Sequence, residues 1–314
     1  MSLERDLLAW LHEHLPASGQ HTVGLGDDAA VLASFDQAGV VVTTDMLTDG
    51  IDFLLEQVDP RRVGHKSLGV NLSDLAAMAA EPIAAFVSLV LPRQGCGRQS
   101  PFELAVGLYR GMMPLAEKLG VEIAGGDTNS WDGPLAISIT AIGKTTSRGP
   151  LSRSGAQVGD QLLVTGQLGG SILGRHLQVE PRVAEALLLH ERYELHAAID
   201  VSNGLALDVS RLAEASLAGA VLDLAAIPVA DAARRLSKKD GRLAVEHALG
   251  DGEDFELVLA VPKQEAARIL GGQPLEVPIT KIGELIETRG LWQVNPAGER
   301  VPLAASGYEH KGDK

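Results

Sequence analysis

The spacing of apolar residues predicts helices and strands that alternate along the whole chain. Helical spacing covers residues 3–15, 61–80, 101–119, 181–190, 204–216 and 263–270. Pro60 before the second of these helices and Gly120 after the third are typical of helix ends. Apolar runs typical of strands occupy residues 30–33, 40–44, 84–91, 121–124, 135–143, 161–165, 197–200, 221–224 and 255–261. This alternation predicts a mixed α+β (α/β) class.

The alternation of predicted helices and strands is interrupted by one segment of different amino-acid composition. Residues 144–160 are rich in Gly, Ser, Thr, Arg and Pro and hold few apolar residues, which is typical of a boundary between domains. A chain of 314 residues also favours about two domains. We therefore expect domains at residues 1–147 and 148–314.

Five apolar runs end in acidic or amide residues, at positions 24–28, 41–45, 70–74, 123–127 and 199–203. Such a run predicts a buried strand that delivers a carboxylate to its tip. Because a buried, unpaired carboxylate is costly, several together indicate shared cations. Oxygen ligands without His or Cys favour magnesium. The alternative for each single residue is a turn or cap. The candidate ligands are Asp28, Asp45, Asp74, Asp127 and Asp200.

The composition narrows the possible partners. The formal net charge of −14 argues against nucleic acid and membrane surfaces as partners. An acidic protein that handles phosphate must recruit cations. The single cysteine, Cys96, allows no disulfide within the chain and favours a reducing cytoplasm. We expect neither a signal peptide nor a membrane span.

The familiar phosphate-binding motifs are missing from the sequence. It contains no G-x-x-x-x-G-K-[ST] loop and no protein-kinase motif set. Gly125 and Gly126 next to a predicted strand could let the backbone approach a phosphate, although a plain tight turn is the alternative. Arg153 in a polar loop is either a solvated side chain or a phosphate clamp.

Taken in order, the motifs closely resemble those of the thiamine-monophosphate kinase family. The similarity extends from about residue 22 to Tyr308. The matching segments are residues 26–30 (GDDAA), 43–45 (TTD), 71–78 (NLSDLAAM), 125–128 (GGDT), 152–155 (SRSG), 200–205 (DVSNGL) and 252–257 (GEDFEL). The resemblance implies the fold of aminoimidazole ribonucleotide synthetase, in which the N-terminal domains of two subunits pair into a β-barrel. A C-terminal α+β domain closes over the nucleotide.

The resemblance also implies an activity and a set of site residues. The reaction is the transfer of phosphate from ATP to thiamine phosphate, in line and with Mg²⁺, giving thiamine diphosphate. The implied metal ligands are Asp28, Thr43, Thr44, Asp45, Asp74, Asp127, Asp200 and Asn203. The implied ATP contacts are Gly126, Asp127, Arg153 and Ser202. The implied substrate contacts are Asp52, Glu253 and Tyr308. No residue need act as a nucleophile.

Two positions depart from the family pattern. Asn203 stands where the family usually has Asp, which keeps an oxygen ligand and removes a charge. Asp52 stands where the family commonly has His, and a carboxylate there can contact the cationic thiazolium. These departures leave two other functions open: an enzyme of the same fold with a different acceptor, and a nucleotide-binding protein without turnover.

Overall fold

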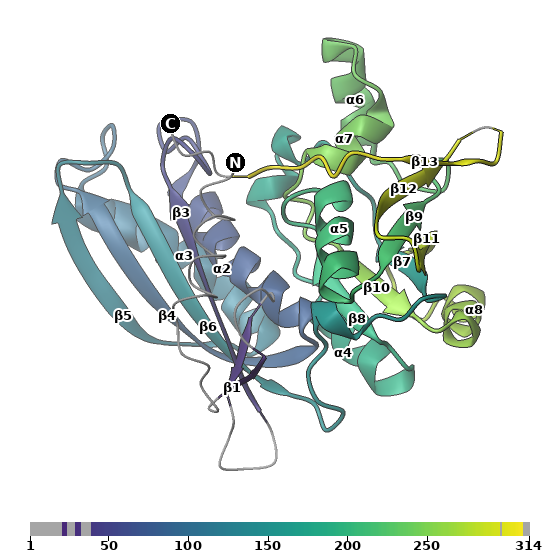
Figure 1. The fold of residues 1–314 in the computed structure, drawn as a ribbon. Coiled ribbons are helices and arrows are strands. Elements are labelled where there is room, and N and C mark those ends of the chain that lie inside the picture. The colour runs from purple at the N-terminus through teal and green to yellow at the C-terminus, as the bar shows by residue number, and fades with distance from the viewer. Residues whose placement is uncertain (1–20, 24–28, 33–38, 296, 310–314) are drawn as a thin grey trace, which may run out of the picture.

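The computed structural model describes residues 21–23, 29–32, 39–295 and 297–309. Two β-sheets lie side by side, each with helices packed against it (Figure 1). We call residues up to Thr145 the N-terminal half and the residues from Arg153 onward the C-terminal half. The helix predicted at residues 3–15 and the candidate ligand Asp28 lie outside the described residues.

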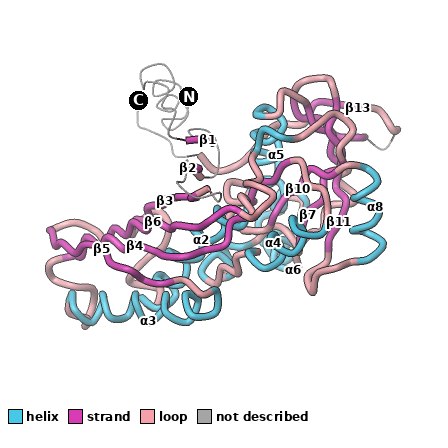
Figure 2. Tube along the Cα trace, turned by 90° about the horizontal axis from the view of Figure 1, so that it is seen from below, coloured by secondary structure: helices cyan, strands magenta, loops and turns pink. Residues whose placement is uncertain are grey.

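The N-terminal half contains a six-stranded sheet in the order β1-β2-β3-β6-β4-β5. Its strands are β1 (His21–Val23), β2 (Ala30–Leu32), β3 (Val40–Thr48), β4 (Ala80–Pro92), β5 (Glu122–Trp131) and β6 (Ala136–Thr145). Only β4 and β5 run parallel, and β5 is an edge strand. Helices α2 (Pro60–Ala77) and α3 (Pro101–Leu119) lie along one face of this sheet (Figure 2).

Local signals explain where these two helices begin and end. Pro60 is in the first turn of α2, and the Asp59 side chain accepts a hydrogen bond from the backbone N–H of Arg61. Ser100 and Glu103 form a reciprocal capping box at the start of α3. Gly120 ends α3 in the left-handed conformation, with φ 69°. Both helices match their predicted spans to within a few residues.

The C-terminal half contains a seven-stranded sheet in the order β13-β12-β9-β11-β7-β10-β8. Its strands are β7 (Gln161–Thr165), β8 (Ala197–Asp200), β9 (Gly219–Leu222), β10 (Leu257–Val261), β11 (Ile279–Ile286), β12 (Gly290–Val294) and β13 (Arg300–Pro302). Its helices are α4 (Val183–Arg192), α5 (Leu205–Ala215), α6 (Asp231–Asp240), α7 (Ala244–Gly250) and α8 (Lys263–Gly272), with 3₁₀ turns η1 (Arg153–Gly155), η2 (Ser171–Leu173) and η3 (Arg175–Leu177).

The central strands of the second sheet are buried on both faces. Leu163 and Leu259 belong to the apolar core that contains residues of α2, α3 and α4. Leu162 and Val258 belong to a second core under α5 and α7. Side chains alternate between faces along a strand, so β7 and β10 feed both cores. The first core therefore joins the two halves, and it fixes the surfaces that carry the site.

Candidate active site

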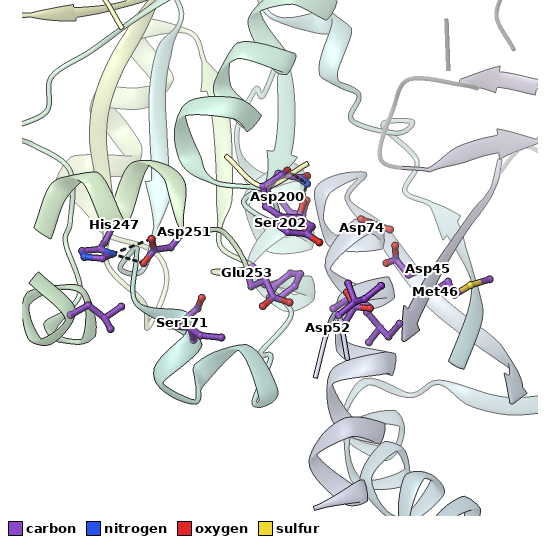
Figure 3. Close-up of a pocket in the computed structure, with 18 of the residues that line it drawn as sticks. Asp45, Met46, Asp52, Asp74, Ser171, Asp200, Ser202, His247, Asp251 and Glu253 are labelled. Carbon is purple, nitrogen blue, oxygen red and sulfur yellow. Dashed lines mark hydrogen bonds and ion pairs between the residues drawn. The ribbon is translucent and has the colours of Figure 1, made fainter. Parts of the chain in front are cut away.

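A cavity of about 620 Å³ lies where the two halves meet (Figure 3). From the N-terminal half it is lined by β3, the loop after β3 and α2. From the C-terminal half it is lined by η2, the end of β8 with the loop after it, α6, α7 with the segment after it, and Tyr308. Eight of the residues predicted from the sequence line it: Asp45, Asp52, Asp74, Asp200, Ser202, Asn203, Glu253 and Tyr308. Residues far apart in the sequence therefore converge on one cavity.

Helix α2 is joined to β3 by polar contacts at the cavity wall. The Thr43 hydroxyl donates to Asp74 Oδ2 at 2.5 Å. The backbone N–H of Asp45 donates to Oδ1 of the buried Asn71 at 3.1 Å. Asn71 is itself held by donating to the Ser67 carbonyl oxygen. These contacts place the carboxylates of Asp45 and Asp74 beside each other on the same side of the cavity.

The other side begins at the end of β8. Asp200 is the last residue of this strand, as the sequence predicts. Its Oδ2 accepts a 2.6 Å hydrogen bond from the hydroxyl of Ser73 on α2, and both residues are buried. Because the two side chains come from different halves, this bond sets the separation between Asp200 and Asp74.

The loop after Asp200 is held by a buried carboxylate. Asp208 Oδ2 accepts hydrogen bonds from the backbone N–H groups of Asn203 and Gly204, both at 2.9 Å. Burial raises the pKa of Asp208 to about 7, while Arg211 and the two N–H groups act in the opposite direction. Asn203 Oδ1 accepts from Arg211, and its Nδ2 donates to the Tyr308 carbonyl oxygen at 3.1 Å.

The segment 252–255 has an unusual backbone. Glu253 and Phe255 have positive φ values of 54° and 52°, a conformation that costs free energy for residues other than glycine. Backbone N–H groups of Glu253 and Phe255 donate to the carbonyl oxygens of Ser202 and Val201, at 2.7 and 2.9 Å. The segment therefore lies directly on the loop after β8, and Glu253 lines the cavity.

The neighbouring Asp254 faces a different environment. Both of its oxygens accept from the Gly169 N–H at 2.9 Å, and it pairs with Arg175. Burial raises the pKa of Asp254 to about 7, and Arg175 acts against this rise. Asp254 therefore stabilises the segment 252–255, while Glu253 faces the cavity.

Sequence reasoning missed a polar cluster on the far wall of the cavity. Nδ1 of the buried His247 lies 2.8 Å from Asp251 Oδ2, and Arg242 lies 3.3 Å from the same carboxylate. Asp240 completes the cluster at 3.4 Å from His247 Nε2. The mixed charges of residues 240–251 were the sequence signal that could have indicated this cluster. Helices α6 and α7, on which it is built, were not predicted from the sequence.

Five predicted site residues in the described part of the chain do not line this cavity. One of them, Thr43, reaches the cavity wall through its hydrogen bond to Asp74. Gly126 and Asp127 lie within the exposed β5 rather than after the end of a strand, because pairing with β4 continues to Trp131. Arg153 lies in η1, where its carbonyl oxygen accepts from Ser216. The Thr44 hydroxyl donates to the Ile139 carbonyl oxygen at 3.2 Å.

Two further expectations about local structure were wrong. Residues 70–74 are not a strand that ends in Asp74, because they form part of α2. Asp45 is not at the tip of a strand either, since β3 continues past it to Thr48. A helix and the middle of a strand therefore present the carboxylates that the sequence placed on strand ends.

The donor set fits a hard divalent cation. The acids and amides at the meeting point of β3, α2 and β8 offer oxygen ligands, the type that magnesium prefers. In the described part of the chain, no three His, Cys, Asp or Glu side chains come close enough to hold a metal ion by themselves. Magnesium usually binds through one or two carboxylates plus water and phosphate oxygens. The residues thus fit a metal held jointly with a phosphorylated ligand.

Comparisons with known proteins agree with this arrangement. Residues 26–145 match the family model of the AIR synthase related protein N-terminal domain, and residues 140–291 match that of its C-terminal domain. The thiamine-monophosphate kinase of Rhodopirellula baltica is 44% identical over 315 residues, covering 98% of this chain and 97% of that protein. The chain belongs to the thiamine-monophosphate kinase family.

Solved structures of this family have the same fold. AaThiL complexed with AMPPCP and TMP superposes with a TM-score of 0.80 at 26% identity, over 98% of this chain and 96% of that one. The thiamine-monophosphate kinase of Stenotrophomonas maltophilia gives a TM-score of 0.72 at 31% identity, over 94% of this chain and 96% of that one.

Among the described residues, no helix is both long and apolar enough to cross a bilayer.

Proposed function

We propose that this chain transfers the γ-phosphate of ATP to thiamine monophosphate, giving thiamine diphosphate. The observation that carries the proposal is the convergence of Asp45, Asp74 and Asp200, from three separate elements, on one cavity that Glu253 also lines. The named relatives are thiamine-monophosphate kinases, and the AaThiL structure contains AMPPCP and TMP. ATP is then the co-substrate and Mg²⁺ the cofactor.

The metal ligands proposed here are the eight named from the resemblance: Asp28, Thr43, Thr44, Asp45, Asp74, Asp127, Asp200 and Asn203. Bound magnesium supplies positive charge that offsets the phosphate charge during transfer. Thr43 orients Asp74, and Ser73 orients Asp200, so both carboxylates are held by neighbouring hydroxyl groups. Such fixed carboxylates lose little conformational freedom when a cation binds.

Ser202, next to Asp200, is the proposed ATP contact that lines the cavity. Gly126, Asp127 and Arg153 are proposed ATP contacts outside its lining. We assign Gly126 and Asp127 to the approach of nucleotide along β5, which is an edge strand in the described sheet.

The thiamine moiety is proposed to bind near Asp52, Glu253 and Tyr308, which share the cavity lining. Two carboxylates suit a cationic thiazolium ring, and the half-exposed Tyr308 ring offers a stacking surface. Asp52 Oδ2 accepts from the Thr48 N–H at 2.6 Å, which fixes this carboxylate at the turn after β3.

The chemistry needs no protein nucleophile. The acceptor is a phosphate group that is already ionised at neutral pH, so no general base has to create the attacking oxygen. The task of the chain is to hold two phosphate groups in line and to exclude water. Asp200 and Ser202 on one wall, facing Asp74 on the other, can restrict both groups.

We further propose a homodimer in which the two N-terminal sheets pair into a β-barrel. Ile83 and Phe86 on β4 are 43% and 41% exposed, and the outer edge of β5 pairs with no other strand among the described residues. The proposed domains are residues 1–147 and residues 148–314, and the C-terminal domain closes over nucleotide and substrate. The proposed location of the protein is the cytoplasm. Light scattering of the purified protein tests the dimer.

A product assay tests the function. The purified chain with ATP, Mg²⁺ and thiamine monophosphate should yield thiamine diphosphate, detected by chromatography. Asp74→Asn should lower kcat at least about a hundredfold, because one metal ligand loses its charge, while circular dichroism stays unchanged. ATP binding without product would favour a protein that has lost turnover, and product from another phosphate acceptor alone would favour a different enzyme of this fold.

A further inference from the structure

We propose that Lys66 is a positioning residue that sets the affinity for the thiamine moiety by holding both walls of its pocket. The proposal rests on the proposed function. Lys66 lies on α2 and does not line the cavity. Its side chain has no exposed surface, which is unusual for a lysine.

The ammonium group of Lys66 contacts one residue from each half of the chain. It donates to the backbone carbonyl oxygen of Asp52 at 2.8 Å, and it pairs with Glu253 Oε1. Asp52 belongs to the N-terminal half and Glu253 to the C-terminal half, and both line the cavity. A single buried cation therefore joins two proposed substrate contacts from opposite halves.

Because the Lys66 ammonium group is buried, its stability depends on the groups that surround it. An ammonium group removed from water costs several kcal/mol unless an anion and further acceptors surround it. The Glu253 side chain is 33% exposed, so the lysine end of the pair is buried and the glutamate end reaches the cavity. The pair therefore constrains Glu253 more than a surface ion pair would.

The pair leaves one carboxylate oxygen available to a ligand. Oε1 is held by Lys66, whereas Oε2 of Glu253 accepts no hydrogen bond from the described residues. The ion pair also offsets part of the negative charge of the pocket, which determines how strongly a cationic ring is attracted. Lys66 thus fixes both the direction and the effective charge of Glu253.

The backbone around Glu253 gives the ion pair a second effect. The positive φ of Glu253 is held by its N–H bond to Ser202, and Lys66 anchors the side chain of the same residue. Without the lysine, this segment would be tethered at fewer points and would open more often. The Asp52 carbonyl oxygen would lose its donor at the same time.

The test compares Lys66→Met and Lys66→Gln with Lys118→Met, a control at an exposed lysine on α3. We expect Lys66→Met to raise the KM for thiamine monophosphate at least about tenfold, as loss of a charged contact predicts, and to leave the KM for ATP nearly unchanged. Lys66→Gln keeps a donor for Asp52 and should show a smaller rise. It also serves as the test variant if Lys66→Met does not fold.

Hydrogen exchange supplies a readout that needs no turnover. In the Lys66 variants, amides of residues 252–255 should exchange faster, while those of β7 stay protected. Unchanged exchange together with an unchanged KM for thiamine monophosphate overturns the proposal. An equal rise in both KM values with a lower Tm also overturns it, because the lysine would then be only structural. If wild-type protein makes no thiamine diphosphate, the proposed function fails. The hydrogen-exchange result still decides whether Lys66 holds the two walls of the pocket.

Discussion

At the scale of single residues, Asn203 is the clearest departure from the family pattern, and its contacts show how an amide is accommodated. Its oxygen accepts from Arg211, and its nitrogen donates to the Tyr308 carbonyl oxygen. An aspartate would keep the first contact and lose the second, because two acceptor oxygens would then face each other. Arg211 would become a full partner for the new charge.

We predict that Asn203→Asp preserves or raises activity, because it restores a charged metal ligand. The Mg²⁺ concentration for half-maximal rate should fall about threefold or more, measured by magnesium titration at saturating ATP. A matched change at Asn129, an exposed amide on β5, should leave this value unchanged. A large loss of turnover in Asn203→Asp would show that the amide contact to Tyr308 is essential.

At the scale of elements, α2 and α3 touch through their backbones. A Cβ atom added to Gly111 would lie 1.8 Å from the Arg61 carbonyl oxygen, and one added to Gly64 would lie 2.0 Å from that of Leu108. No side chain fits between two helices at that separation. The glycines therefore set the position of α2, which carries Asp74, Ser73 and Lys66.

Gly111→Ala should consequently destabilise the protein by about 2 kcal/mol or more, because the helices must move apart. Urea denaturation measures the change. Gly271→Ala in α8 is the matched control, since nothing lies within 4 Å of its added Cβ, and there alanine should be neutral or stabilising by up to about 1 kcal/mol. Equal stability of the two variants would contradict the close contact.

The sequence predicted the helices and strands that have clear capping residues or apolar runs of their own. It did not predict those in which such patterns are weak or interrupted. The caps of α3 and the apolar runs of β7 and β8 gave their bounds closely. Helix α6 was missed because Ala233 is its only buried residue. Strand β11 was missed because a register shift between Lys281 and Gly283 breaks its alternation.

The site could be predicted only in part, for a related reason. Asp200 is the last residue of a short apolar strand, so its sequence signal is local. The contact between Lys66 and Glu253 joins residues that are far apart in the chain, and no short pattern contains both. The extent of β5, and therefore the place of Asp127, depends on its partner β4. Tertiary pairing decides these features.

At the scale of the whole molecule, buried histidines link stability to pH. Burial lowers the pKa of His176 and His190 below the ordinary 6.5, and Arg148 adds to the effect at His190. The unfolded chain therefore binds more protons than the folded chain as pH falls below 6.5. Their contribution to stability is complete above this value and is lost as pH falls toward the lower folded pKa.

We expect His190→Gln to lose less stability than wild type when pH falls from about 7.5 to about 5.5. Each histidine contributes at most about 1.4 kcal/mol per pH unit in this window, so urea denaturation at the two pH values can resolve the difference. The variant should be less stable than wild type at the higher pH, because Thr146 loses its contact with Nδ1. An identical pH dependence in both proteins would remove His190 from this linkage.

The acidic lining of the cavity has a consequence for the order of encounter. Within the described residues, seven carboxylates face it: Asp45, Asp52, Asp74, Asp200, Asp240, Asp251 and Glu253. Such a field repels a bare triphosphate and attracts a positively charged ring. Nucleotide should therefore bind only as its complex with a divalent cation, and removal of the cation by a chelator should slow nucleotide binding.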